Sequence, residues 1–176
     1  MNFTEEKKRE LFQICRKSIV AGLEGKRYTP EPDPDLSEKC GVFVTLKIGG
    51  RLRGCIGYIQ PIKPLYEAIS DMAYAAAFND PRFPPVSRNE VKDLRIEITV
   101  LSPLEQIDDI NKIEVGKHGL FIKKGVFQGL LLPQVATEEN WDRITFLQHT
   151  CLKAGLAEDG WTDAEIYVFT GEILKE

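Results

Sequence analysis

An alternating apolar segment that ends in two adjacent glycines is the feature that most constrains the fold. Between residues 41 and 48, apolar side chains occupy every second position, which is the period of a β-strand. The dipeptide Gly49-Gly50 follows, and it suits the positive φ angles of a two-residue hairpin turn. We therefore expect residues 41–48 and 51–59 to be antiparallel partners.

Helical spacing flanks this hairpin on both sides. Thr4 is a good helix cap, and the apolar positions after it recur every three or four residues, so we expect a helix over 4–24. Pro64 starts a second helical pattern, and a strand pattern around 94–101 follows it. The order of elements from residue 41 to residue 101 is therefore ββαβ.

The same order recurs in the second half of the chain. Residues 119–170 contain two strand patterns that meet at a glycine, a helical pattern and a final strand. We infer an internal duplication of ββαβ units, about 41–101 and 119–170. Chance similarity between apolar strands is the alternative, because identity between the halves is low. Either way, the pattern predicts an α+β fold with mostly antiparallel sheet and helices packed on it.

Length and charge narrow the class of protein. A chain of 176 residues is long enough for about one domain, so we expect a single domain over 1–176. The formal net charge of −4 makes nucleic acid an unlikely partner. No apolar run approaches the roughly 20 residues that cross a bilayer. Four scattered cysteines without a C-x-x-C pair are typical of reduced thiols, so we expect a cytoplasmic protein.

The second strand of the hairpin carries the strongest chemical pattern. Strict alternation would place Arg51, Arg53 and Cys55 on one face and Leu52 on the core face. A guanidinium near a thiol favours the thiolate, so Cys55 is a candidate nucleophile and Arg53 a candidate anion-binding residue. The alternative is that Cys55 is only a small packed residue.

Glycines surround this cysteine. Gly54 and Gly57 lack side chains, so a ligand or another backbone can approach the strand closely at these positions. We include both as candidate ligand-binding residues.

Two further residues are candidates for proton transfer. Glu97 alternates with apolar neighbours, so it should leave the core face and either orient Arg53 or act as an acid or base. His118 precedes a predicted strand and could pair with Cys55, although a histidine in a turn is commonly a surface residue. His149 has a weaker claim. Two histidines and scattered cysteines form no metal-ligand spacing, so we expect no metal site.

The segment 80–85 places Arg82 and Phe83 on a loop stiffened by prolines. Such loops often carry binding residues, although Phe83 could equally close the edge of the core. An aromatic residue before Pro84 also raises the possibility of a cis peptide bond there.

These motifs together resemble a known family, the one named after the AMME syndrome candidate region. The six residues 52–57, Leu-Arg-Gly-Cys-Ile-Gly, match its signature in full. The similarity extends over nearly the whole chain, through Asp80-Pro81-Arg82-Phe83-Pro84-Pro85, His118-Gly119-Leu120, Leu132-Pro133-Gln134-Val135-Ala136, Trp141-Asp142 and Cys151-Leu152-Lys153-Ala154-Gly155.

The resemblance implies two lobes with a cleft between them, near which the signature lies. The prokaryotic members that this chain most resembles belong to the AmmeMemoRadiSam system, in which they accompany a Memo-like protein and a radical-SAM protein. The family has no established reaction, and the resemblance leaves the cofactor unknown. Fold similarity alone does not establish an activity.

Two classes of function fit these observations. In the first, the protein is an enzyme or enzyme component in which Arg53 binds a small anionic ligand, Cys55 is the reactive thiol, and Glu97 or His118 handles protons. In the second, it is a noncatalytic module that binds a ligand or protein in the same cleft through Arg53 and Arg82.

Overall fold

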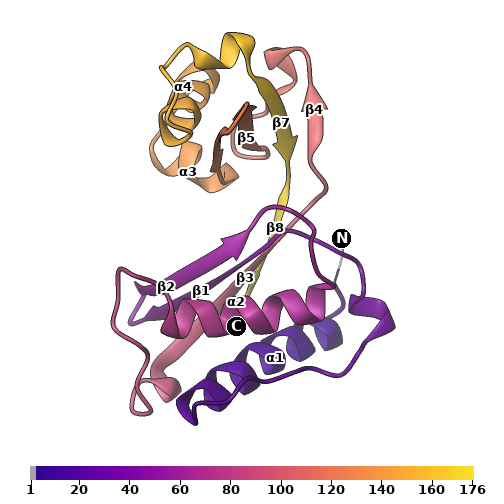
Figure 1. Cartoon of the computed structure of the whole chain (residues 1–176), viewed down its shortest axis with the longest axis vertical. Helices are drawn as coiled ribbons and strands as arrows, with labels where there is room; N and C mark the ends of the chain where they lie inside the picture. The colour runs from indigo at the N-terminus through magenta and orange to yellow at the C-terminus, as the bar shows by residue number, and fades with distance from the viewer. Residues whose placement is uncertain (1–2) are drawn as a thin grey trace. The chain divides into compact units, whose positions relative to one another are not determined.

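Two α+β units, each built on a four-stranded sheet, make up the chain (Figure 1). The structure is a computed structural model that describes residues 3–176, so Met1 and Asn2 of the expected domain lie outside the described residues. The first unit contains the chain up to Leu101 and the segment 172–176, and the second contains residues 102–171. The expected α+β class with mostly antiparallel sheet is confirmed.

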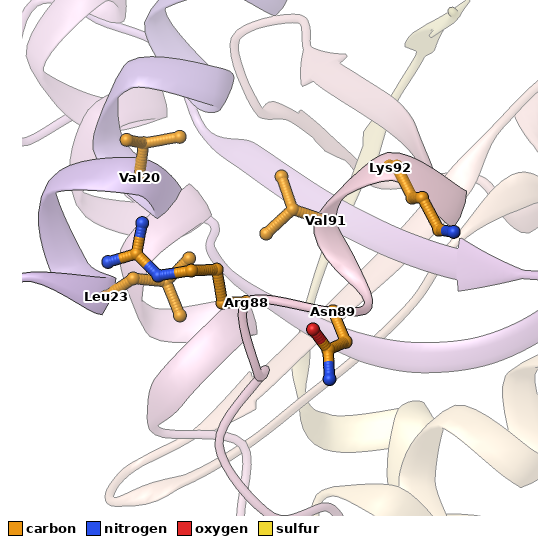
Figure 2. A pocket seen from close by; sticks show the side chains of 6 residues that line it. All are labelled: Val20, Leu23, Arg88, Asn89, Val91 and Lys92. Carbon is orange, nitrogen blue, oxygen red and sulfur yellow. The ribbon is translucent and has the colours of Figure 1, made fainter.

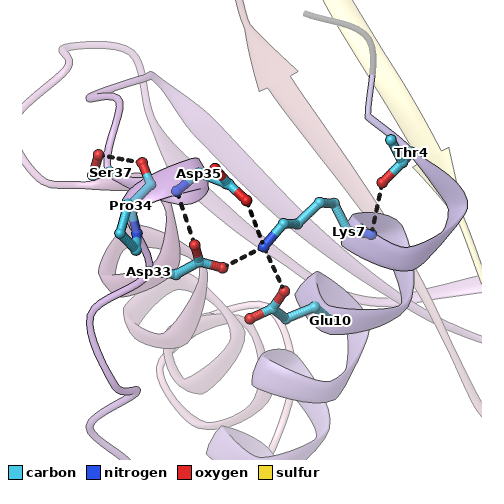
Figure 3. Close-up of polar contacts among 7 residues, drawn as sticks. All are labelled: Thr4, Lys7, Glu10, Asp33, Pro34, Asp35 and Ser37. Carbon is cyan, nitrogen blue, oxygen red and sulfur yellow. Dashed lines mark hydrogen bonds and ion pairs between the residues drawn. The ribbon is translucent and has the colours of Figure 1, made fainter.

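Helix α1 (Glu5–Leu23) begins where the sequence predicts, because the Thr4 hydroxyl accepts a hydrogen bond from the amide of Lys7. The Lys7 amine in turn bonds Asp33 at 2.7 Å and Glu10 at 3.1 Å, and it pairs with Asp35 (Figure 3). These carboxylates raise the pKa of Lys7 above its ordinary value, chiefly through the hydrogen bond that Lys7 donates to Asp33. The network fixes the first turns of α1 to the 3₁₀ turn η1 (Pro34–Leu36).

The first sheet has the strand order β2-β1-β3-β8, with helices packed on one face. The side chains of β1 alternate, and Val42, Val44 and Leu46 are buried in one cluster with apolar residues of α1 and α2. The opposite face carries the remaining side chains of each strand. The elements are β1 (Val42–Ile48), β2 (Arg51–Tyr58), α2 (Leu65–Phe78), η2 (Val91–Asp93), β3 (Leu94–Leu101) and β8 (Gly171–Lys175).

A register shift in the hairpin changes the faces predicted for β2. Gly54 pairs with Leu46, but Leu52 pairs with Lys47, so Arg53 is an extra residue in β2. The bulge moves Leu52 to the face opposite the core, where 41% of it is exposed. The prediction that Leu52 points into the core, on the face opposite Arg53 and Cys55, was therefore wrong, because it assumed unbroken alternation.

The second unit has the strand order β4-β7-β5-β6, and α4 packs against β5 and β6. Its core cluster includes Leu120, Ile122, Phe146 and Cys151. Helix α3, which the sequence did not predict, begins at Pro133 directly after β6. The elements are β4 (Glu105–Ile107), η3 (Ile110–Lys112), β5 (Gly119–Lys124), β6 (Phe127–Leu131), α3 (Pro133–Glu138), α4 (Arg143–Lys153), η4 (Gly160–Asp163) and β7 (Glu165–Phe169).

The units exchange their fourth strands. β4 follows β3 along the chain but pairs with β7, and β8 follows β7 but lies beside β3. The two crossing segments are tied together, because the amide of Ser102 donates to the carbonyl of Thr170 at 2.8 Å and the amide of Thr170 donates to the Ser102 hydroxyl at 2.9 Å.

Both units repeat the connectivity that underlies the duplication hypothesis. The order β2-β1-β3 in one sheet corresponds to β6-β5-β7 in the other, with α2 and α4 in equivalent places along the chain. Gly54 and Gly129 occupy matching positions. A side chain on Gly54 would overlap the carbonyl of Ala76 in α2, and one on Gly129 would lie 2.6 Å from the amide nitrogen of Ala154, the residue that caps α4. Each glycine lets a helix approach an edge strand closely. A duplication in evolution stays an interpretation.

Candidate functional site: a thiol on the edge strand β2

Cys55 differs from the other three cysteines in its surroundings. None of the four forms a disulfide among residues 3–176, but Cys15, Cys40 and Cys151 are buried while Cys55 is partly exposed. Burial raises the pKa of the Cys40 thiol to about 11 and also raises the pKa of Cys15 and Cys151. The thiolate is the nucleophilic form, so these three thiols are poor nucleophiles at neutral pH.

The main chain of Cys55 is held by an ion pair from the segment after α2. The Asp80 carboxylate accepts the Cys55 amide at 2.8 Å, and the Arg82 guanidinium donates to the Cys55 carbonyl at 3.2 Å. β2 is an edge strand, so these side chains satisfy polar groups that a neighbouring strand would otherwise bond. Asp80 and Arg82 thus fix the backbone that carries the thiol.

Asp80 and Arg82 also bond each other directly. The Asp80 carboxylate, whose side chain is only 2% exposed, accepts Nε and Nη2 of Arg82 at 2.9 and 2.7 Å. These hydrogen bonds hold the pKa of Asp80 well below its usual range. The pKa of Arg82 is raised, chiefly by the bond to Asp80, and the charge of an ionised Cys55 thiol adds to the rise. Arg82 is therefore a cation held beside Cys55.

The sulfur of Cys55 lies in a polar row on the face of the first sheet opposite the core. Cys55 and Glu97 both pair with Thr45, one from each side. The Thr45 hydroxyl donates to Sγ of Cys55 at 3.1 Å, and the Glu97 carboxylate accepts from the Lys47 amine at 2.8 Å. A thiol, a hydroxyl and an ion pair therefore occupy three adjacent strands.

Arg53 is held by Glu90 rather than by Glu97. Nε and Nη2 of Arg53 donate to the two carboxylate oxygens of Glu90 at 2.7 and 3.3 Å. The hydrogen bond from Arg53 lowers the pKa of Glu90 to about 2. The suggestion that Glu97 orients Arg53 was therefore wrong. Nη1 of Arg53 is buried and has no partner within residues 3–176.

Phe83 lies between the two arginines. Its ring centroid is 5.9 Å from Cζ of Arg53 and 5.6 Å from Cζ of Arg82, which are cation–π distances. Phe83 is partly exposed, and its neighbours Arg82 and Pro84 are exposed. The described peptide bonds are all trans, so the suggested cis bond at Pro84 was wrong.

The two glycines of the signature have packing roles. Gly54 admits the backbone of α2, and a side chain on Gly57 would overlap the Phe43 ring. Their predicted contacts with a ligand stay predictions.

The two histidines lie in the second unit. Nδ1 of His118 accepts the amide of Glu114 at 3.2 Å, so Nδ1 is engaged in a local turn. His149 stacks on Trp141 with ring centroids 3.9 Å apart. The Cys55–His118 pair and the cleft between the lobes stay predictions. Among residues 3–176 there is no group of three or more histidine, cysteine or acidic side chains suited to a metal, and no helix is long and apolar enough to span a membrane.

The sequence patterns did not single out the two acids that hold Cys55 and Arg53 in place, Asp80 and Glu90. Asp80 was considered only as part of a loop, and Glu90 was not a candidate. Besides Arg53, the Glu90 carboxylate accepts the Ser87 hydroxyl at 2.8 Å. One signal for Asp80 was available. It follows the C-terminal end of α2, where the helix dipole disfavours an acid, so its presence there requires a compensating cation.

Comparison with known proteins places the chain in a family. The AMMECR1 family model matches residues 12–174. A Methanosarcina mazei protein is 48% identical over 98% of this chain and 93% of its own length, and a Methanopyrus kandleri protein is 48% identical over 94% and 86%. The crystal structure of an uncharacterised Pyrococcus horikoshii protein is similar with a TM-score of 0.90 and 44% identity, over 99% of this chain and 93% of that one. The family resemblance of the sequence motifs is thereby confirmed, and the chain belongs to the AMMECR1 family.

Proposed function

We propose that the protein is a thiol-dependent enzyme, or a component of one, in which Cys55 is the reacting group. The observation that carries the proposal is the contrast among the cysteines. Three thiols are buried with a raised pKa, whereas Cys55 is partly exposed on a backbone held by Asp80 and Arg82. Rigid support of a nucleophile and a nearby cation are what thiol chemistry requires.

The exposed guanidinium of Arg82 indicates that the substrate is an anion. Its side chain is 54% exposed, and only Nε and Nη2 are used in bonds to Asp80 and Cys55 among the described residues. Nη1 is therefore available to an anionic group of a substrate whose electrophilic atom meets the thiol. Arg53, for which the sequence predicts this role, is also paired with a carboxylate but is only 13% exposed, so it is much less accessible to a substrate than Arg82. It supports the loop that carries Phe83.

Glu97 is the proton-transferring group that we assign on the same face. Adjacent strands lie roughly 4.8 Å apart, so Glu97 is about two strand spacings from Cys55 and does not deprotonate the thiol directly. It acts instead on the substrate, or through the Thr45 hydroxyl. His118 stays a prediction as the second candidate for proton transfer.

Alkylation rates test the assignment of Cys55. The protein is treated with iodoacetamide and with the anionic iodoacetate, and each cysteine is followed by mass spectrometry. Cys55 should react at least tenfold faster than the three buried cysteines, and Arg82→Gln should slow iodoacetate more than iodoacetamide because the guanidinium attracts the anion. Arg51→Gln, at an exposed arginine of the same strand, is the matched control. Equal rates for all four thiols would remove the basis of the proposal.

A noncatalytic binding module is the second candidate function. The neutralisation of both arginines by carboxylates favours it, because their guanidinium groups then mainly shape the exposed segment around Phe83. The partners we propose are the Memo-like and radical-SAM proteins that the family resemblance implies. Arginine and aromatic residues at such surfaces commonly dominate binding energy.

One pair of variants distinguishes these functions. Cys55→Ser preserves the size of the side chain and removes the thiol, whereas Phe83→Ala removes the aromatic surface and leaves the thiol. Binding to each purified partner is measured by calorimetry, and function by complementation of a deletion strain. An enzyme loses complementation with Cys55→Ser although partner binding persists. A binding module retains complementation with Cys55→Ser and loses partner binding with Phe83→Ala.

A further inference from the structure

A cavity of about 470 Å³ lies in the first unit, separate from the residues assigned to Cys55 chemistry. Val20 and Leu23 of α1 form one side, and Val91 from η2 faces them (Figure 2). Val20 is 42% exposed, so the cavity is open to solvent on this side. The volume of the cavity is within the range of small-molecule sites, which are mostly apolar with a few polar groups.

The polar lining of this cavity is cationic and contains no acid. Arg88, Asn89 and Lys92 complete the lining. Neither Arg88 nor Lys92 has a hydrogen-bond or ion-pair partner within the described part of the chain. In Figure 2 the Arg88 side chain extends toward α1, beside Val20 and Leu23, whereas the Lys92 amine points away. Arg88 is therefore the cation closest to the apolar walls.

Arg88 is not needed to cap the nearby helix. The last turn of α1 contains no basic residue, but its carbonyls at Ala21 and Gly22 already accept the amides of Glu24, Gly25 and Lys26. Arg16, Arg53 and Arg82 of this unit each bond a carboxylate, whereas Arg88 bonds none among the described residues. An unpaired guanidinium beside apolar walls is complementary to a ligand with both an apolar body and a negative charge.

We propose that this cavity binds a small organic anion with an apolar body, such as an aliphatic carboxylate. Arg88 bonds the carboxylate, and Val20, Leu23 and Val91 contact the hydrocarbon. The site is independent of the function proposed for Cys55, since none of its lining residues bonds Cys55, Asp80 or Arg82.

Calorimetric titration of the full chain with octanoate tests the proposal. Octanoate should bind at one saturable site, and Arg88→Gln should weaken it about tenfold because a charge-assisted hydrogen bond is lost. Val20→Gln should weaken it by placing a polar group on the apolar wall. Arg51→Gln removes an exposed arginine outside the cavity and should leave the affinity unchanged.

Two related compounds test the two halves of the recognition. 1-Octanol retains the chain without the charge, and acetate retains the charge without the chain, so each should bind at least tenfold more weakly than octanoate. Amide chemical shifts should change on octanoate addition at residues 20–23 and 88–92. The proposal is overturned if octanoate does not saturate, if Arg88→Gln binds it normally, if octanol binds as well as octanoate, or if the shifts change elsewhere. A cavity that captures only an acidic peptide, and no octanoate, would equally overturn it.

Discussion

At the scale of single residues, the backbone of Cys55 is held by a carboxylate 25 positions away. Asp80 bonds the Cys55 amide and both neutralises and orients Arg82, which in turn bonds the Cys55 carbonyl. A buried carboxylate with these bonds stabilises the fold as well as the site, because its removal leaves a cation and an amide without an acceptor.

Asp80→Asn should therefore lower the free energy of unfolding by about 2–3 kcal/mol, since the neutral amide loses the charge-assisted bonds to Arg82. The matched control is Asp163→Asn. Its exposed pair with Lys124 contributes no more than about 1 kcal/mol. Urea denaturation of both variants measures the difference. Equal losses in the free energy of unfolding would mean that the buried Asp80 pair contributes no more to stability than the exposed one.

The lowered pKa of Glu90 makes the stability of the folded chain depend on pH in the acidic range. Its pKa falls from an ordinary 4.5 to about 2 in the folded chain, mainly through the bond from Arg53. A lowered pKa stabilises the folded state above pH 4.5, and this contribution is lost as the pH falls toward 2. Glu90→Gln should therefore lose less stability than the parent between pH 5 and 2 in denaturant titrations. Glu158→Gln, at an exposed site, should follow the parent; the idea fails if Glu90→Gln does so too.

At the scale of elements, the packing of helix against edge strand depends on a glycine in each unit. Gly54→Ala would force a methyl group into the carbonyl of Ala76. This carbonyl belongs to the backbone of α2, which cannot move aside as easily as a flexible side chain could. We expect a loss of about 3 kcal/mol in the free energy of unfolding. Gly49→Ala, in the hairpin turn with φ of 55° and open space around it, should lose only about 1 kcal/mol. A smaller loss at Gly54 would show that the strand shifts to accommodate the methyl group.

Local patterns predicted these elements well, and contacts between distant residues explain what they missed. Thr4, Gly49-Gly50 and Pro64 act on their immediate neighbours, so the helix starts and the hairpin followed from sequence. The bulge at Arg53 did not, because alternation alone gives no sign of an added residue. The partnership of Glu90 with Arg53 spans 37 positions, and the candidate site was therefore found through its thiol but not through its supporting acids.

At the scale of the whole molecule, each sheet is completed by a strand that follows the other sheet in the chain. β8, which follows β7 of the second unit, completes the first sheet, and β4, which follows β3 of the first unit, completes the second. Leu174 of β8 is buried in the core of the first unit, and Ile107 of β4 is buried in the core of the second. No pattern in the sequence predicts the exchange, because a short strand is compatible with either sheet edge. Its energetic consequence is that a substitution near the end of the chain acts on a core formed mainly by the first hundred residues.

Leu174→Ala should therefore reduce hydrogen-exchange protection of amides in β1 and β3 while those in β5 and β7 retain theirs. Ile107→Ala should have the opposite pattern. Each substitution removes a buried aliphatic side chain and should cost about 2–5 kcal/mol in its own unit. The two variants control for each other because both lie on edge strands that complete a sheet. Loss of protection in both units at once, from either variant, would mean that the exchanged strands join the units into one cooperative folding unit, since protection reports the free energy of each opening separately.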